Sequence, residues 1–205
     1  MQRALFVIAA FALAACDPAP PNTEEAASAD TELSLLCDAF AHVSFDALAA
    51  AYGADNLREE TMPGPEGESY IATVLYPGDT ARRLEIVWAD DARTAPASVS
   101  VSGEGSLWRG PHNIAIGDDI AHVEAANGGP FRLWGFGWDY GGWVSEWNGG
   151  QLSDQNNCRV RVHFEAANEP TGVLGDSEFA SDLPAMRAAA PAVTEFGLMF
   201  AGSDQ

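Results

Sequence analysis

The sequence predicts an α+β fold. Two tandem repeats, each a short helix followed by antiparallel strands, form one sheet-based domain with the helices packed on it. Three observations support this fold class. Short apolar segments start and stop at residues typical of helix caps, alternating apolar and polar runs are typical of strands, and the helix-then-strands order occurs twice. Hydrophobic residues make up 47% of the 205-residue chain, which is enough for a packed core.

Two helices are predicted from matching start and stop residues. Segments 44–53 and 119–128 align without gaps, with Ser44 or Asp119 as the N-cap and a glycine at the end. In each segment one apolar residue follows the cap and another comes three residues later, which places both on one face of a helix. A chance similarity of two short helices is the alternative to a true repeat.

The predicted strands follow the two helices in equal number. They are residues 70–77, 82–90 and 97–103 after the first helix, and residues 131–140, 143–150 and 158–166 after the second. A last segment adds a short helix at 181–190, with Ser181 as its N-cap, and a strand at 193–200. The first repeat therefore covers residues 33–110 and the second covers residues 111–205.

The N-terminal residues predict export and a lipid anchor. Residues 1–15 contain one arginine and then an apolar run that is too short to span a bilayer comfortably, which is typical of a signal peptide. Leu13-Ala14-Ala15-Cys16 resembles the bacterial lipobox, and this implies a lipidated Cys16 that anchors the chain. The alternative is a plain secretory signal with an incidental cysteine. Residues 16–32, rich in proline, alanine and acidic residues, predict a lipidated, disordered tether.

The charge balance excludes one class of partner. Ten basic residues, all arginine, stand against thirty acidic residues, and the net charge is −20. Nucleic-acid binding needs clustered cations, so no nucleic-acid partner is expected. The same charge disfavours contact with anionic lipid, so the lipid bilayer is expected to be a partner through the acyl anchor alone. The acidity is interpreted as an aid to solubility, with an acidic face for a basic partner as the alternative.

The cysteines predict one disulfide bond. With Cys16 assigned to lipid, Cys37 and Cys158 remain as a single pair in an oxidising compartment. A bond between them closes a loop of about 120 residues and is worth about 4–5 kcal/mol in the chain-entropy model. Two free thiols are the alternative.

The second predicted helix carries a resemblance to known families. Gly117, the helix, Gly128-Gly129-Pro130 and the aromatic strand after them resemble small outer-membrane assembly lipoproteins of the SmpA/OmlA type. They also resemble the tandem-repeat beta-lactamase inhibitor protein. Both resemblances imply short helices on an antiparallel sheet whose exposed face and loops contact other proteins. The cysteine pairing and the aromatic-rich second half depart from these families. The whole chain also resembles a group of exported bacterial proteins, which implies no activity.

The segment FRLWGFGWDYGGWVSEWNGG, residues 131–150, supplies the candidate binding residues. If Gly141 and Gly142 form a two-residue hairpin turn, six aromatic rings share one side of the hairpin. That side is either core, covered by the helix at 119–127 with some rings exposed at the rim, or a binding surface for sugars or a protein. Trp143 and Trp147 are expected to be the most exposed. The candidate binding residues are Trp134, Trp138, Tyr140, Trp143 and Trp147.

No catalytic or cofactor motif is present in the sequence. His42, His112, His122 and His163 lack the spacing of a metal site, and no GxSxG motif marks a nucleophile. The predicted function is therefore a non-enzymatic protein-interaction module with an envelope protein as partner. The predicted location is the periplasm, anchored to the inner or outer membrane of a Gram-negative-type bacterium. The alternative is a periplasmic glycan-binding protein that uses the aromatic face, and an enzyme is a more distant third.

Overall fold

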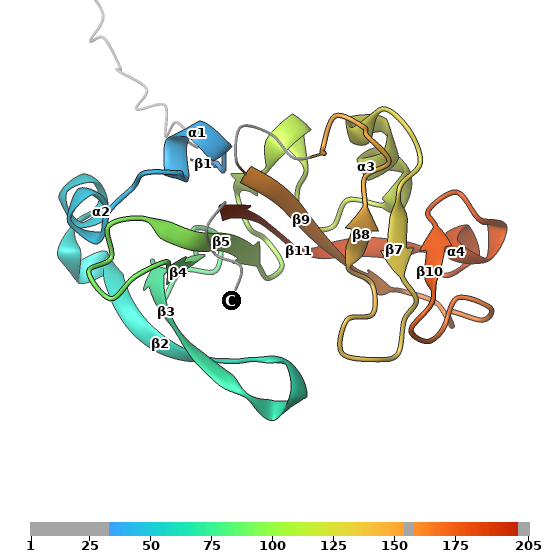
Figure 1. Ribbon diagram of the computed structural model, residues 1–205, viewed down its shortest axis with the longest axis horizontal. Helices are drawn as coiled ribbons and strands as arrows, with labels where there is room; N and C mark the ends of the chain where they lie inside the picture. Colours follow the sequence, from blue (N-terminus) through green and yellow to red (C-terminus); the bar gives the residue numbers. More distant parts are fainter. Residues whose placement is uncertain (1–32, 154–157, 201–205) are drawn as a thin grey trace, which may run out of the picture. The chain divides into compact units, whose positions relative to one another are not determined.

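The computed structural model describes residues 33–153 and 158–200, which form a mixed fold with a large antiparallel sheet and few short helices (Figure 1). The predicted fold class is confirmed at this level. The predicted signal peptide, Cys16 and the tether lie outside the described residues. Within the described ranges, no helix has the length and apolar character needed to cross a membrane.

The large sheet contains six antiparallel strands in the order β2-β3-β4-β5-β11-β9. Their bounds are β2 (Leu57–Pro63), β3 (Ser69–Leu75), β4 (Leu84–Trp88), β5 (Pro96–Ser102), β9 (Cys158–Ala166) and β11 (Pro191–Phe200). The strand β2 was not predicted, because LREETMP lacks a run of apolar residues. It lies at the edge of the sheet, where charged side chains are common.

Two smaller sheets complete the strand pairing of the described residues. One has the order β10-β7-β8, and the other is a parallel pair, β1-β6. Their bounds are β1 (Leu33–Ser34), β6 (Trp108–Arg109), β7 (Arg132–Trp134), β8 (Val144–Glu146) and β10 (Glu178–Ala180). An antiparallel bridge between Trp143 and His163 joins the end of the β7–β8 connection to β9. The small three-stranded sheet therefore continues beside the large one.

The helices in the described residues are short. They are α1 (Cys37–Phe40), α2 (Phe45–Tyr52), α3 (Ile120–Asn127) and α4 (Pro184–Ala188), with 3₁₀ turns η1 (Ala54–Asn56), η2 (Pro65–Gly67) and η3 (Pro111–Asn113). The two predicted caps are confirmed: the Ala47 N–H donates to Ser44 Oγ at 3.2 Å, and the His122 N–H donates to Asp119 Oδ1 at 2.7 Å.

The predicted cap at Ser181 is wrong. The helix α4 begins at Pro184 after Leu183, whose side chain makes no capping hydrogen bond. Ser181 is fully buried, and its Oγ accepts a hydrogen bond from the Phe131 N–H at 3.0 Å. The hydroxyl therefore satisfies the backbone of the residue before β7, far away in the sequence, instead of a helix end.

The strand arrangement does not confirm two equivalent repeats. After α2 come four strands of the large sheet, whereas α3 is followed by two three-residue strands of the small sheet. The large sheet takes strands from both halves of the chain, because β9 and β11 pair beside β5. The repeat stays a prediction.

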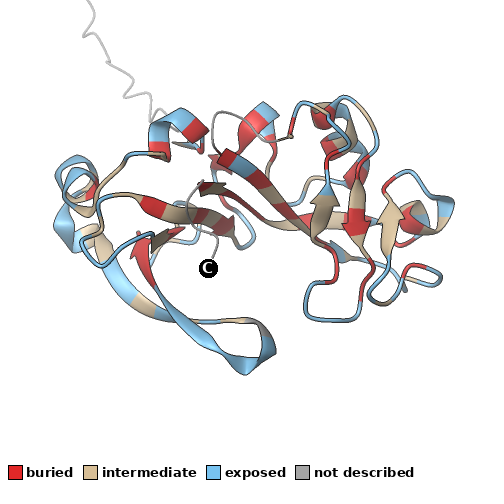
Figure 2. Cartoon of the chain, in the orientation of Figure 1, coloured by how far each residue is buried: buried red, intermediate tan, exposed pale blue. Residues whose placement is uncertain are grey.

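The large sheet has one apolar face and one polar face. On β5, β9 and β11, side chains alternate between buried apolar residues and more accessible polar ones. The apolar face carries Val99, Val101, Val160, Val162, Phe164, Phe196 and Leu198, all within the buried core that includes residues of α1 and α3. Figure 2 shows this alternation along the central strands. The opposite face is free to form a site.

The predicted disulfide is confirmed. Cys37, the first residue of α1, is bonded to Cys158, the first residue of β9, with Cα atoms 5.8 Å apart. The bond joins the start of the described chain to a strand 121 residues later. It fixes the edge strand β9, which carries part of the candidate site.

Candidate functional site

The predicted two-residue turn at Gly141-Gly142 is wrong. Strand β7 ends at Trp134, and the Trp134 N–H donates to the Trp143 carbonyl at 2.9 Å. Residues 135–142 therefore form a loop between the two strands, called here the aromatic loop. The Gly135 and Phe136 N–H groups donate to Ser177 and Val173 instead of continuing the hairpin. A Cβ on Gly135 would lie 2.6 Å from the Gly175 carbonyl oxygen, so this close packing needs glycine.

The six aromatic rings consequently separate into two groups. Phe136 and Trp147 are each 7% exposed, so the expected exposure of Trp147 is wrong. The Trp147 ring packs on Phe131, with centroids 5.1 Å apart, and its Nε1–H donates to the Val160 carbonyl at 3.0 Å. It is a core residue with its polar group satisfied.

The other rings lie at the surface. Trp138 and Tyr140 are 36% and 45% exposed, and their centroids are 5.3 Å apart. Trp134 contacts Trp138 edge-to-face at 5.8 Å. Trp143 is half-buried and lies beside β9, so the expectation that it is among the most exposed rings is also wrong. The sequence left open whether the aromatic rings are core or surface. Phe136 and Trp147 are core, whereas Trp138 and Tyr140 are exposed.

An open cavity of about 860 Å³ lies over the polar face of the large sheet and is called here the first cavity. The tip of the β2–β3 hairpin, with Gly64 and Tyr70, lines one side, and Tyr140 and Trp143 line the other. In Figure 1 the hairpin tip and the aromatic loop extend on the same side of the sheet. The polar residues that the sheet contributes are Glu85, Ser98, Ser100, Arg161 and Glu195.

The sheet register explains why these residues meet. Glu85 pairs with Ser100, Ser100 with Gly197, and Gly197 with Arg161, so the four residues form one row across four strands. Residues opposite one another share a face. The middle of the row has no side chain because residue 197 is glycine. A larger residue does not fit there, since a Cβ on Gly197 would lie 2.5 Å from the Val99 carbonyl oxygen. The floor is therefore hollow between the charged residues.

A β-bulge directs Glu195 into the first cavity. Val193 pairs with Phe164 and Glu195 pairs with His163, so Thr194 is an extra residue in β11. Bulges change the face to which the following side chains point. As a result, Val193 is buried in the core while Glu195 lines the cavity.

The Glu195 carboxyl has an unusual environment. Burial raises its pKa to about 7; the Arg161 guanidinium opposes this rise, and the Glu85 carboxylate adds to it. Among the described residues, Glu195 has no hydrogen-bond partner that lowers this pKa. A largely buried polar group without a partner is costly unless a ligand or water satisfies it.

Arg161 and His163 hold Trp143 at the cavity wall. The Arg161 Cζ lies 4.1 Å from the Trp143 ring centroid, and the His163 ring lies 4.8 Å away. His163 Nε2 is 2.9 Å from the Gly141 carbonyl oxygen, so this nitrogen donates, and Nδ1 accepts from the Thr194 hydroxyl at 2.8 Å.

Burial shifts the titration of both groups. It lowers the pKa of His163, although the Gly141 carbonyl opposes this, and His163 therefore favours the neutral form. Burial also lowers the pKa of Arg161, and the charge of the Glu195 carboxylate opposes this change. A neutral His163 is the form whose two hydrogen bonds fix the end of the aromatic loop.

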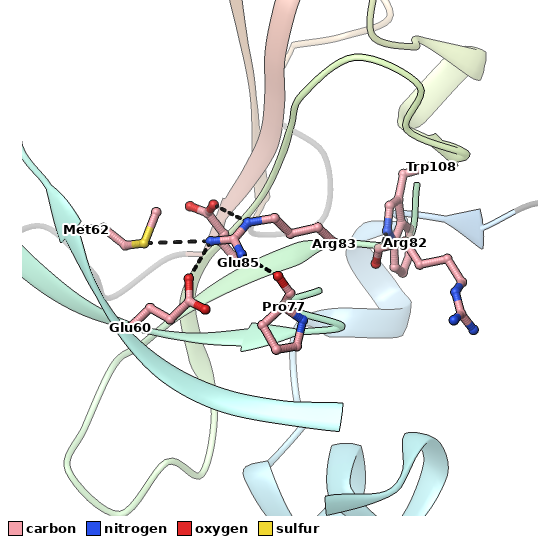
Figure 3. A network of polar contacts seen from close by, with 7 residues as sticks. All are labelled: Glu60, Met62, Pro77, Arg82, Arg83, Glu85 and Trp108. Carbon is pink, nitrogen blue, oxygen red and sulfur yellow. Dashed lines mark hydrogen bonds and ion pairs between the residues drawn. The ribbon is translucent and has the colours of Figure 1, made fainter. Parts of the chain in front are cut away.

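Glu85 forms an ion pair with Arg83. Arg83 Nε lies 3.1 Å from Glu85 Oε1, and its Nη2 lies 2.8 Å from Glu60 Oε2 (Figure 3). Arg83, the residue before β4, thus links a carboxylate of β2 to a carboxylate of β4. Burial and then the carboxylates of Glu85 and Glu195 raise the pKa of the nearby Tyr70 phenol, which therefore stays protonated.

The candidate binding residues are only partly brought together. Tyr140 and Trp143 line the first cavity, whereas Trp134, Trp138 and Trp147 do not. Sequence reasoning missed Tyr70, Glu85, Arg161 and Glu195. A usable signal was a single charged residue within an otherwise apolar strand, as at Glu85 and Glu195. In the part of the chain that the structure describes, no group of three or more His, Cys, Asp or Glu residues is arranged to hold a metal ion.

Comparison with known proteins finds no matching family model, no matching curated protein and no matching solved structure.

Proposed function

We propose that this chain is a glycan-binding protein and that the first cavity is its binding site. The observation that carries the proposal is an open cavity lined by the exposed Tyr140 ring, the half-buried Trp143 ring and the charged side chains of Arg161 and Glu195. Ligand sites are concave, and a few placed polar groups fix the orientation of the ligand. Because Leu13-Ala14-Ala15-Cys16 resembles a lipobox, the proposed glycan-binding protein is a periplasm-facing lipoprotein anchored through Cys16.

The chemistry of the lining suits sugars. The Tyr140 and Trp143 rings offer apolar faces to the C–H groups of a sugar ring. The Glu195 carboxyl and the Arg161 guanidinium offer an acceptor and donors to its hydroxyl groups. The volume of about 860 Å³ lies within the 300–1,000 Å³ range of small-molecule sites.

Calorimetric titration of the purified full chain with soluble oligosaccharides tests this proposal. A useful panel contains β-1,4-linked N-acetylglucosamine, glucose and glucosamine oligomers. We expect at least one series to bind and Tyr140→Ala to weaken it by about tenfold, which is about 1.4 kcal/mol. Tyr140→Phe keeps the ring and is expected to bind nearly as well.

Leu174→Ala is the matched control, because Leu174 is 51% exposed and does not line the first cavity. It is expected to leave glycan affinity unchanged. The absence of binding to every oligomer, or equal losses in Tyr140→Ala and Leu174→Ala, would contradict the proposal.

A protein-interaction module is the second candidate function. Leu174 and Trp138 are both exposed and lie on neighbouring segments, since a Cβ on Gly137 would be 3.3 Å from Leu174 Cδ2. Exposed aromatic and aliphatic side chains of this kind are common at the centre of protein interfaces. An envelope partner captured by the wild type and by Tyr140→Ala, but lost in Leu174→Ala, would favour this function.

A further inference from the structure

A second cavity of about 620 Å³ adjoins the first. Its lining includes Trp134, Ser145 and Asn148 from the β7–β8 region and Met199 from β11. It also shares three residues with the first cavity: Tyr140, Trp143 and Arg161. The two cavities are therefore adjacent and share one set of side chains.

The two shared aromatic side chains, Tyr140 and Trp143, are accessible to a ligand or held in a fixed position. Tyr140 is 45% exposed, and the half-buried Trp143 is fixed by its contacts with Arg161 and His163. Aromatic rings held in one position lose little conformational entropy when a ligand packs on them. A ligand that packs on these rings therefore contacts residues that line both cavities.

The second cavity also contains a polar group that the fold leaves unsatisfied. The Ser145 Oγ is buried and has no hydrogen-bond partner among the described residues. Such groups are uncommon in folded proteins, and a site for a ligand or water is one explanation for them. Arg161 contributes hydrogen-bond donors at the junction of the two cavities.

We propose that the two cavities are successive parts of one groove that binds an extended oligosaccharide chain across Tyr140 and Trp143. This inference rests on the proposed function and names its ligand class as a chain of several sugar units. Each cavity alone has the volume of a small-molecule site, so the pair exceeds what a single sugar needs.

The test is a chain-length series on the full wild-type chain, from the monosaccharide to the hexasaccharide of whichever oligomer binds. We expect affinity to rise by at least about tenfold from the shortest bound oligomer to the longest, and then to level off once both cavities are occupied. Equal affinity at every length would overturn the extended groove and leave the first cavity as a site. The absence of binding at every length would overturn both proposals.

Ser145→Ala provides a separate measurement. The hydroxyl has no internal partner, so its removal is not expected to lower the melting temperature. It is expected to weaken the longest oligomers by about threefold to tenfold and to leave the shortest unchanged. Equal effects on short and long oligomers would refute the role of the second cavity, and the wild-type series would still decide the length dependence.

Discussion

Replacement of Glu195 by glutamine should remove a pH-dependent cost of folding. The carboxyl pKa rises from 4.5 to about 7 on folding because the side chain is largely buried. The folded state therefore binds the proton more tightly than the unfolded state, and stability is lost as the pH rises through this interval. One pKa unit corresponds to about 1.4 kcal/mol, so the loss between pH 4 and pH 8 is about 3 kcal/mol.

Glutamine has nearly the same shape and does not ionise in this range. We expect the unfolding free energy of Glu195→Gln, relative to wild type, to increase by about 3 kcal/mol between pH 4 and pH 8. Urea denaturation at several pH values measures this difference. His163 also titrates in this range, but it is present in both proteins and its contribution cancels.

The pH dependence of the difference is more informative than its value at one pH. Changes in packing or hydrogen bonding at residue 195 add an offset that is nearly independent of pH. Parallel stability curves for the two proteins would refute the reasoning, because they would show that Glu195 ionises in the folded protein as easily as in the unfolded one. A gain in stability accompanied by a loss of glycan affinity is the expected trade-off at a binding site.

Three further predictions concern the framework of the site. Reduction of the Cys37–Cys158 disulfide is expected to lower the unfolding free energy by about 4–5 kcal/mol, as measured by denaturation with and without reductant; a change below 1 kcal/mol would contradict the chain-entropy estimate. Gly197→Ala should cost about 1–3 kcal/mol, because the added Cβ meets a β5 carbonyl oxygen; an unchanged melting temperature would show that the strands separate easily. Trp147→Ala should cost about 3–5 kcal/mol, whereas Tyr140→Ala should change the melting temperature little; similar losses for both would contradict the division of the rings.

The sequence predicted those elements whose signals are local. Ser44 and Asp119 each bond to a backbone N–H three residues later, so a short segment contains both the donor and the acceptor. The alternating residues of the strand predicted at 158–166 likewise lie as the pattern implies in β9, with Arg159, Arg161 and His163 on the face opposite Val160 and Val162. The disulfide followed from the number of cysteines once Cys16 was assigned to lipid.

The predicted aromatic hairpin failed because distant backbone groups competed for the same hydrogen bonds. Gly135 and Phe136 donate to Ser177 and Val173, which lie about forty residues further along the chain. Nothing within residues 131–150 encodes that partner. The strand β2 was missed for a related reason, since a polar edge strand is stabilised by its pairing with β3 and not by its own apolar pattern.

The sequence alone determined the acidic charge, the cysteine pair, the helix caps and the alternating strands, because each of these depends on residue type or on neighbours a few positions apart. Only the tertiary structure decided which strands pair, that Thr194 forms a bulge, and that Glu195, Arg161 and Tyr140 surround one cavity. The physical reason is that strand register and bulges are set by hydrogen bonds between segments far apart in the chain. A shift of one residue would exchange the polar and apolar faces of β11 and remove the candidate site.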